Sequence, residues 1–257
     1  MASSHENASQ KSLDQIIAEK KHQLDTSITE SFSSFDPQFT AEEHEMFETL
    51  QIKKPLTYNL YGSPEGKEEE INEYIQSLGN DQQTSQSAAQ AIVRMSKEIL
   101  AGFDLPAAWV TLRASHPNNH FDIPRWHTDG HKNLRYKVVM TLQGPGTLLS
   151  KVTTETRAEY RKRDQQGREK IKDSYPELSQ REQSIKHSDE NRELFVSLFP
   201  ADKVQQAAPR QGIIFIVGNE QTAAFHSEPR INTCRLFMSV MPGTVEHIED
   251  WRNQCNK

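Results

Sequence analysis

The chain has 257 residues, of which 34% are hydrophobic and 26% charged, and its formal net charge is −6. These values fit one domain with polar additions, and they exclude a collagen, a coiled coil and a wholly disordered chain. The acidic balance offers no general attraction to nucleic acid or to an anionic membrane surface.

The first 40 residues are rich in Ser, Gln, Glu and Lys, and we expect residues 1–40 to form a flexible polar arm. Residues 26–36 are expected to be a linker within this arm. One amphipathic helix is predicted before the linker from the spacing of Leu13, Ile16, Ile17 and Leu24. A single domain is then expected over residues 41–257.

Three helices are predicted at the start of this domain. The first follows Thr40 and Glu43, which have the spacing of a capping box. The other two are indicated by apolar residues at i, i+3, i+4 and i+7 over 71–78 and 88–99. Gly79 and Gly102 follow these stripes, and each is expected to end its helix. Leu56, Tyr58 and Leu60 alternate with polar residues, as in a short strand.

From residue 109 onward the sequence pattern predicts mainly β strands. A strongly polar segment at about 151–205 has a helical pattern and interrupts the β segments, so we expect a helical insertion there. Phe195, Leu198 and Phe199 are its dense apolar cluster and are expected to dock it to the sheet. The predicted strands are 109–112, 135–142, 213–217, 222–226 and 233–241. Short strands divided in this way predict an α+β protein with a mainly β core, built as a sandwich or barrel.

The chemistry-bearing motif is His127-Thr-Asp129. In an extended segment, residues i and i+2 point to the same side, so the imidazole and the carboxylate can converge on one point. A third ligand would complete a facial triad, and His226 at the end of an apolar strand is the best candidate. Two histidines and one carboxylate with open coordination positions suit iron(II).

These motifs resemble those of the iron(II)- and 2-oxoglutarate-dependent oxygenases, over residues 109–243 without the insertion. Members carry His-x-Asp, then a distant His, then an Arg or Lys on the final strand, where Arg235 stands here. The resemblance implies a double-stranded β-helix (jelly roll) and a dioxygenase activity. It further implies iron(II) held by His127, Asp129 and His226, and 2-oxoglutarate held by Arg235. Phe237 departs from the pattern, because many members have Ser two residues after the Arg.

The substrate implied by the resemblance is an unidentified small molecule or peptide, which would be hydroxylated. Arg125 shares the ligand side of its segment, so it could bind an anionic substrate or make a salt bridge. Either Tyr136 or Lys137 could help to hold a carboxylate. Trp126 is expected in the core, and Cys234 on the strand face opposite to Arg235.

Other interpretations of the same residues remain open. In a chain with ten histidines, His127-x-Asp129 could occur by chance, His226 could be an ordinary histidine, and Arg235 could pair with a core carboxylate. The histidines at 116, 120 and 131 are expected in a loop rim, with a second metal site as a minor alternative. The chain could also be a cupin-like metal-dependent isomerase or hydrolase, although no well-placed Glu follows His131. Finally, it could be a non-catalytic binding module on a degenerate oxygenase fold.

The cellular compartment is indicated only by what the sequence lacks. Two cysteines, Cys234 and Cys255, are too few for a disulfide framework. The first ten residues are polar and have no signal-peptide core, and no apolar run approaches the length of a membrane span. We therefore expect a cytoplasmic protein without a membrane or nucleic-acid partner, whose oligomeric state the sequence does not indicate.

Overall fold

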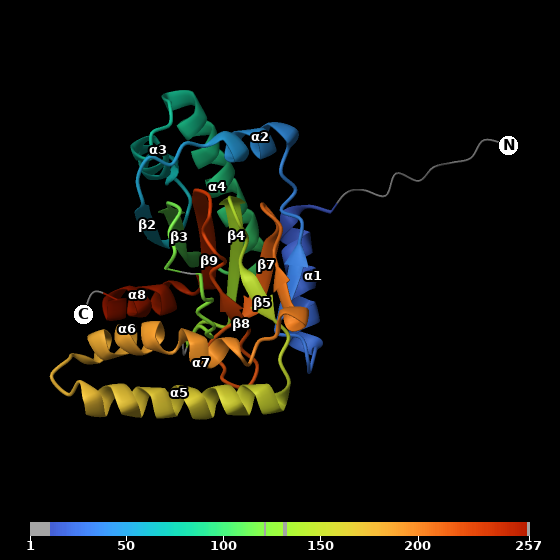
Figure 1. The fold of residues 1–257 in the computed structure, drawn as a ribbon. Coiled ribbons are helices and arrows are strands. Elements are labelled where there is room, and N and C mark those ends of the chain that lie inside the picture. The colour runs from blue at the N-terminus through green and yellow to red at the C-terminus, as the bar shows by residue number, and fades with distance from the viewer. Residues whose placement is uncertain (1–10, 121, 131–132, 256–257) are drawn as a thin grey trace.

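The computed structural model describes residues 11–255 except 121 and 131–132. At its centre is a six-stranded antiparallel sheet with the strand order β1-β7-β4-β9-β3-β2 (Figure 1). Its strands are β1 (Phe32–Phe35), β2 (Leu56–Gly62), β3 (Ala107–Ser115), β4 (Tyr136–Gln143), β7 (Gly212–Ile216) and β9 (Arg235–Gly243).

A smaller sheet contains β6 (Val204–Gln206), β5 (Leu148–Ser150) and β8 (Phe225–Ser227), in that order. An isolated antiparallel bridge between His127 and His226 adds the segment around His127 to the free side of β8. From β3 to β9 the chain therefore passes back and forth between the two sheets, except that β5 and β6, on either side of a helical segment, both lie in the small one. This order is that of a double-stranded β-helix, so the predicted fold class is confirmed.

Side chains of the large sheet alternate between two faces, as the period of a strand requires. In β4, Val138, Met140 and Leu142 pack into the main core beneath the helices. Lys137 and Val139, which point the opposite way, line a cavity on the side of the small sheet. The sheet thus separates a helix-covered apolar core from a face that can carry polar groups.

Helices cover the outer face of the large sheet. Helix α4 runs along this face and packs against α1 and α3 (Figure 1). Thr40 and Glu43 form the predicted capping box at the start of α2. The bounds are α1 (Leu13–Thr26), α2 (Ala41–Thr49), α3 (Glu68–Ser77) and α4 (Gln82–Phe103); α8 (Val245–Cys255) packs near β2 and β3.

The structure differs from the expected polar arm over residues 1–40. Helix α1 buries Leu13, Ile17 and Leu24 against the core, and β1 forms an edge strand where a linker was expected. The apolar stripe of α1 needs a partner, and that partner is α4, which lies far along the chain. Residues 1–10 of the expected arm lie outside the described residues.

Gly102 does not end α4, contrary to the prediction, because the helix continues to Phe103 and Asp104 takes the left-handed conformation. A side chain at Gly102 would meet the carbonyl oxygen of Asp14 and the Cβ of Ile17, both at 2.6 Å. The glycine therefore permits close packing of α1 on α4.

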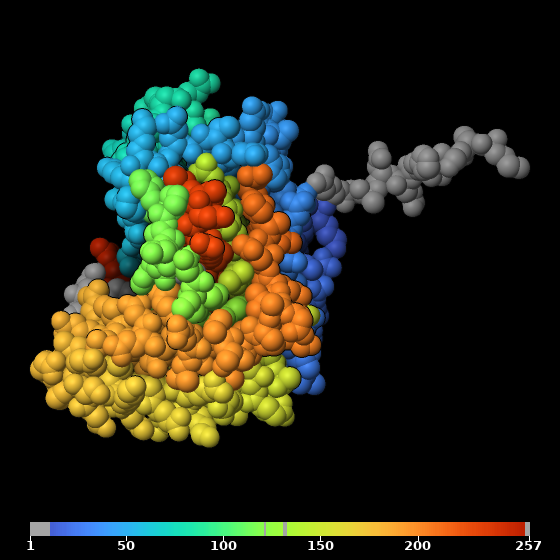
Figure 2. Space-filling model, viewed as in Figure 1, coloured from blue at the N-terminus to red at the C-terminus, as the bar shows by residue number. Residues whose placement is uncertain are grey.

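The insertion between β5 and β6 consists of α5 (Thr154–Ser174), α6 (Gln180–Glu190), α7 (Arg192–Val196) and a short 3₁₀ turn (Ala201–Lys203). In Figure 2 these yellow and orange segments form one broad part of the visible surface. Phe195 and Phe199 pack in a cluster with Trp126 and Phe225. The aromatic residues thus join the insertion to the small sheet and to the residue before His127.

Candidate metal centre

The backbone brings the three predicted ligands together. The His127 amide donates to the His226 carbonyl over 3.1 Å, and the His226 amide donates back over 3.0 Å. Residues that exchange both hydrogen bonds across an antiparallel pair have side chains on the same face. The Gly218 amide, just beyond β7, donates to the Asp129 carbonyl over 2.9 Å. Both sheets therefore hold the His127–Asp129 segment in place.

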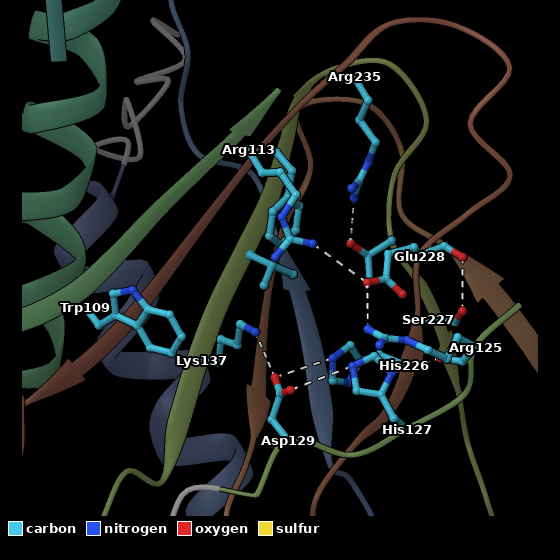
Figure 3. A pocket seen from close by; sticks show the side chains of 13 residues that line it. Trp109, Arg113, Arg125, His127, Asp129, Lys137, His226, Ser227, Glu228 and Arg235 are labelled. Carbon is cyan, nitrogen blue, oxygen red and sulfur yellow. Dashed lines mark hydrogen bonds and ion pairs between the residues drawn. The ribbon is translucent and has the colours of Figure 1, made fainter. Parts of the chain in front are cut away.

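The ligand atoms converge on one point (Figure 3). The Nε2 atom of His127 lies 3.7 Å from Oδ1 of Asp129, and Nε2 of His226 lies 3.4 Å from Oδ2. All three ligand atoms lie within 4.8 Å of one another. With metal–ligand bonds of about 2.1 Å, neighbouring ligand atoms would be about 3 Å apart. The ligand atoms would therefore move closer together when a metal binds.

Hydrogen bonds at the far side of each ring leave both Nε2 atoms able to bind a metal. His127 Nδ1 lies 2.8 Å from the Arg125 carbonyl oxygen, and His226 Nδ1 lies 3.3 Å from that of Ala224. A carbonyl can only accept, so each Nδ1 carries a proton, and in the neutral form of each ring Nε2 presents a lone pair. Metal-binding histidines are oriented in this way, and the donor set fits a divalent transition metal.

The protonation states also favour metal binding. Burial raises the pKa of Asp129, but the charge and hydrogen bond of Lys137 together with the two neighbouring histidines outweigh this effect, and the pKa lies well below its ordinary value. Lys137 Nζ donates to Asp129 Oδ2 over 2.8 Å. Burial and the neighbouring His127 lower the pKa of His226 to about 3. At neutral pH the site therefore offers a carboxylate and a neutral imidazole, the forms that bind a metal.

Arg235 is buried in the same cavity as the triad, on the neighbouring strand β9. Its Nε donates to the Pro145 carbonyl over 2.9 Å, and one Nη donates to the hydroxyls of Thr141 and Thr147 over 3.2 and 3.4 Å. Burial lowers its pKa to about 10, so it stays protonated at neutral pH. Among the described residues, no carboxylate lies within ion-pair distance of Arg235. The alternative of a pair with a core carboxylate thus has no direct contact among these residues, although the nearby charge of Glu228 partly offsets the effect of burial on the pKa of Arg235.

Phe237 lies beside Arg235 on β9, and the guanidinium carbon is 4.6 Å from the centre of its ring. Both residues line the cavity, so the departure from the family pattern places an aromatic face against the guanidinium. The ring lies over the guanidinium, whose Nε and one Nη keep their hydrogen bonds to neighbouring oxygens.

The cavity has a volume of about 230 Å³ and contains residues that sequence reasoning did not single out. Arg113 and Trp109 lie on the inner face of β3, and Glu228 follows β8. The alternation of side chains along β3 could have indicated that Trp109 and Arg113 lie on one face of this strand. Nothing local in the sequence indicates Glu228 or Thr147, because their roles depend on how the two sheets meet.

No protein-family model and no curated protein matches the sequence. Several solved structures match the fold. A Pseudomonas putida prolyl-4-hydroxylase is 9% identical, with a TM-score of 0.40, and the match covers 88% of this chain and 98% of that one. HygX from Streptomyces hygroscopicus, with nickel and 2-oxoglutarate bound, is 13% identical, with a TM-score of 0.43 and coverages of 88% and 86%.

A third match is a prolyl hydroxylase from Trichoplax adhaerens in complex with a hypoxia-inducible-factor peptide. It is 7% identical, with a TM-score of 0.42 and coverages of 92% and 93%. These likenesses are distant. The alternation of strands between the two sheets and the position of the triad identify the fold on their own. The chain has the double-stranded β-helix fold that the resemblance of its motifs implied.

The remaining predicted residues can be placed within this fold. Arg125 lines the cavity, whereas Trp126 points the other way and is buried in the aromatic cluster. Lys137 faces Asp129, while the Tyr136 hydroxyl donates to Asp25 of α1 on the opposite side of the sheet. Cys234 packs against the main core, on the opposite face from Arg235, as expected.

The other histidines of the predicted loop take no part in the triad. His116 Nε2 lies 2.8 Å from the carbonyl oxygen of Ile52, and His120 contacts Arg192 of α7. His131 lies outside the described residues. Within the described ranges, the His127–Asp129–His226 group is the one set of His, Cys, Asp and Glu side chains placed to hold a metal. No helix among the described residues is long and apolar enough to cross a membrane.

Proposed function

We propose that this protein is an iron(II)-dependent dioxygenase that uses 2-oxoglutarate to hydroxylate a small-molecule or peptide substrate. His127, Asp129 and His226 would hold the iron, and Arg235 would bind the distal carboxylate of 2-oxoglutarate. Iron(II) with 2-oxoglutarate would supply the oxidising chemistry, in which the co-substrate is decarboxylated to succinate while oxygen is consumed. The chain itself contributes positioning, charge and exclusion of water.

The observation that carries this proposal is the buried, protonated Arg235, which lies in one cavity with the triad and has no carboxylate within ion-pair distance among the described residues. A buried charge is costly unless it is paired. Its present partners are neutral oxygens, those of Pro145, Thr141 and Thr147. A carboxylate can accept two parallel hydrogen bonds from a guanidinium, so one end of 2-oxoglutarate would supply the missing partner.

Lys137 has a defined part in this proposal. Its ammonium holds Asp129 ionised and orients the carboxylate through Oδ2. The backbone carbonyls of Arg125 and Ala224 fix the two imidazole tautomers. These contacts would preorganise the three ligand atoms, and such outer contacts are typically worth about 10- to 100-fold in metal affinity or activity.

The test is succinate release from purified protein that has been loaded with iron(II) under anaerobic conditions and then exposed to oxygen and 2-oxoglutarate. Slow succinate formation is expected without a primary substrate, and His127→Ala is expected to reduce it by about 100-fold or more. Arg168→Gln, which changes an exposed cation on α5, is the control and should retain the rate. Equal rates in wild type and His127→Ala would contradict the proposal.

A further inference from the structure

The pairing that holds the two histidines continues toward the mouth of the cavity. His127 lies opposite His226 in an antiparallel register. Two residues further along, this register sets Arg125 opposite Glu228, on the same face as the ligands. Arg125 Nη2 lies 3.1 Å from Glu228 Oε1, as expected for such a cross-strand pair. A charged pair thus sits directly beside the candidate metal position (Figure 3).

A second guanidinium reaches the same carboxylate oxygen. Arg113 of β3, from the facing sheet, has Nη1 3.9 Å from Glu228 Oε1. The two arginine side chains retain 45% and 34% of their exposure, whereas Glu228 retains 12%. The carboxylate is therefore buried between two cations that still have surface facing the cavity.

This cluster has unused hydrogen-bonding capacity. Glu228 Oε2 and Arg125 Nε are both buried and have no hydrogen-bond partner. One carboxylate oxygen serves two guanidiniums, each of which can form a two-pronged pair with an anion. Buried polar groups left without partners are costly. Such a cluster is better satisfied when a further charged or polar ligand enters it.

The charge of the cavity indicates the sign of that ligand. Among the described residues the walls carry four cations and two carboxylates in addition to the two histidines. The cations are Arg113, Arg125, Lys137 and Arg235, and the carboxylates are Asp129 and Glu228. A divalent metal and a doubly charged 2-oxoglutarate would cancel each other. The positive excess would then remain for the molecule to be oxidised.

The helical insertion also contacts Arg125. Ser188 of α6 accepts a hydrogen bond from Arg125 Nη1 over 3.2 Å. Trp109 and Phe237 line the same cavity and add aromatic surface beside the two arginines. The cavity therefore combines a fixed cationic end with apolar walls.

From this geometry we infer that Arg113 and Arg125 form an anion clamp for the primary substrate, which carries a carboxylate or phosphate group. Glu228 holds the two guanidiniums together, and Ser188 fixes the outer side of Arg125. The inference rests on the proposed function for the identity of the site, and it names the class of the substrate. A bound anion would lie next to the metal position, so the atom to be oxidised would be close to the anionic group.

The test is calorimetric binding to protein loaded with nickel(II) and saturated with 2-oxoglutarate, which needs no turnover. The probes are 3-phenylpropanoate, phenyl phosphate and the neutral 3-phenylpropanamide. At least one anion is expected to bind at least about tenfold more tightly than the amide, a difference of about 1.4 kcal/mol. The anion that binds best identifies whether the clamp prefers a carboxylate or a phosphate.

Variants assign the preference to the clamp. Arg113→Gln and Arg125→Gln are each expected to remove most of the preference for the anion, whereas Arg125→Lys should retain part of it. The exposed Arg168→Gln should leave it unchanged. Affinity for 2-oxoglutarate should change less than threefold in Arg113→Gln, because Arg235 is intact. Arg113 lies on β3, away from the ligand segments, so its variant changes the clamp without touching the triad.

Three results would overturn the inference. They are equal affinity for the acid and the amide, an anion preference that survives in both arginine variants, and no anion binding at concentrations on the order of 10 mM. Failure of the proposed function looks different. In that case 2-oxoglutarate neither binds nor is consumed, yet the anion preference and its loss in Arg113→Gln can still be measured.

Discussion

Arg235→Gln tests the co-substrate site most sharply. The substitution removes a buried charge that faces the triad and is held by neutral oxygens. Truncating one partner of a buried, hydrogen-bonded charge pair typically costs 2 to 5 kcal/mol. At about 1.4 kcal/mol per factor of ten, the Kd for 2-oxoglutarate should rise by about 30-fold to about 4,000-fold. The near-complete burial of Arg235 favours the upper half of this range.

The assay is anaerobic calorimetry of 2-oxoglutarate with nickel(II)-loaded protein, with nickel stoichiometry as the check that the variant still folds. Arg113→Gln is the matched control, because it removes a cation from the same cavity at a position assigned to the substrate. If Arg235→Gln changes the Kd by less than threefold, or if the two variants weaken binding equally, the reasoning about Arg235 is refuted.

Three further predictions concern the ion pair, the helix packing and the insertion. Lys137→Met should destabilise the metal-free protein by about 3 kcal/mol, because it leaves Asp129 without its ion-pair partner. Calorimetry should show a Tm that is about 6–12 °C lower. An equal drop in Tm in the nickel-loaded protein would contradict this prediction. Gly102→Ala should lower the free energy of unfolding, measured in urea, by about 1–3 kcal/mol. Ala has the better helix propensity, but its Cβ would meet α1. A variant more stable than the wild type would refute the packing argument. Burial lowers the pKa of His187. Below pH 6.5 the unfolded state therefore takes up a proton that the folded state resists, and stability falls by up to about 1.4 kcal/mol per pH unit. His187→Gln should flatten this dependence of stability on pH between pH 7 and 5.5, and identical slopes in the variant and the wild type would count against it.

The sequence could predict the triad because its geometry is local. The spacing of His127 and Asp129 alone places both side chains on one side of an extended segment. His226 required a further inference from strand order, and the structure shows the reason for its position, since it pairs directly with His127.

The charged surroundings of the triad could not be predicted from the sequence. Thr147 precedes β5 and Glu228 follows β8, and they meet Arg235 and Arg113 only after the sheets face each other. Their local sequence has no pattern that distinguishes them from ordinary polar residues. The contribution of Lys137 was one of two alternatives, because the face of β4 that reaches the cavity depends on which face the helices cover.

For the N-terminal region, the expectation drawn from composition was wrong. Its composition suggested a flexible arm, although Leu13, Ile17 and Leu24 already gave the apolar stripe of a helix. Composition averages over both faces of a helix, so a mostly polar segment can still have one face that packs. The partner of that face, α4, begins at Gln82, and no local pattern links the two.

The central claim is that His127, Asp129 and His226 hold one iron(II). The most direct measurement is anaerobic equilibrium dialysis with iron(II), followed by elemental analysis of the wild type, His127→Ala, Asp129→Asn and His226→Ala. The account predicts one iron per chain in the wild type and a loss of affinity of about 100-fold or more in each variant. Equal iron binding by the wild type and any of these variants, or no iron bound by the wild type, would contradict it.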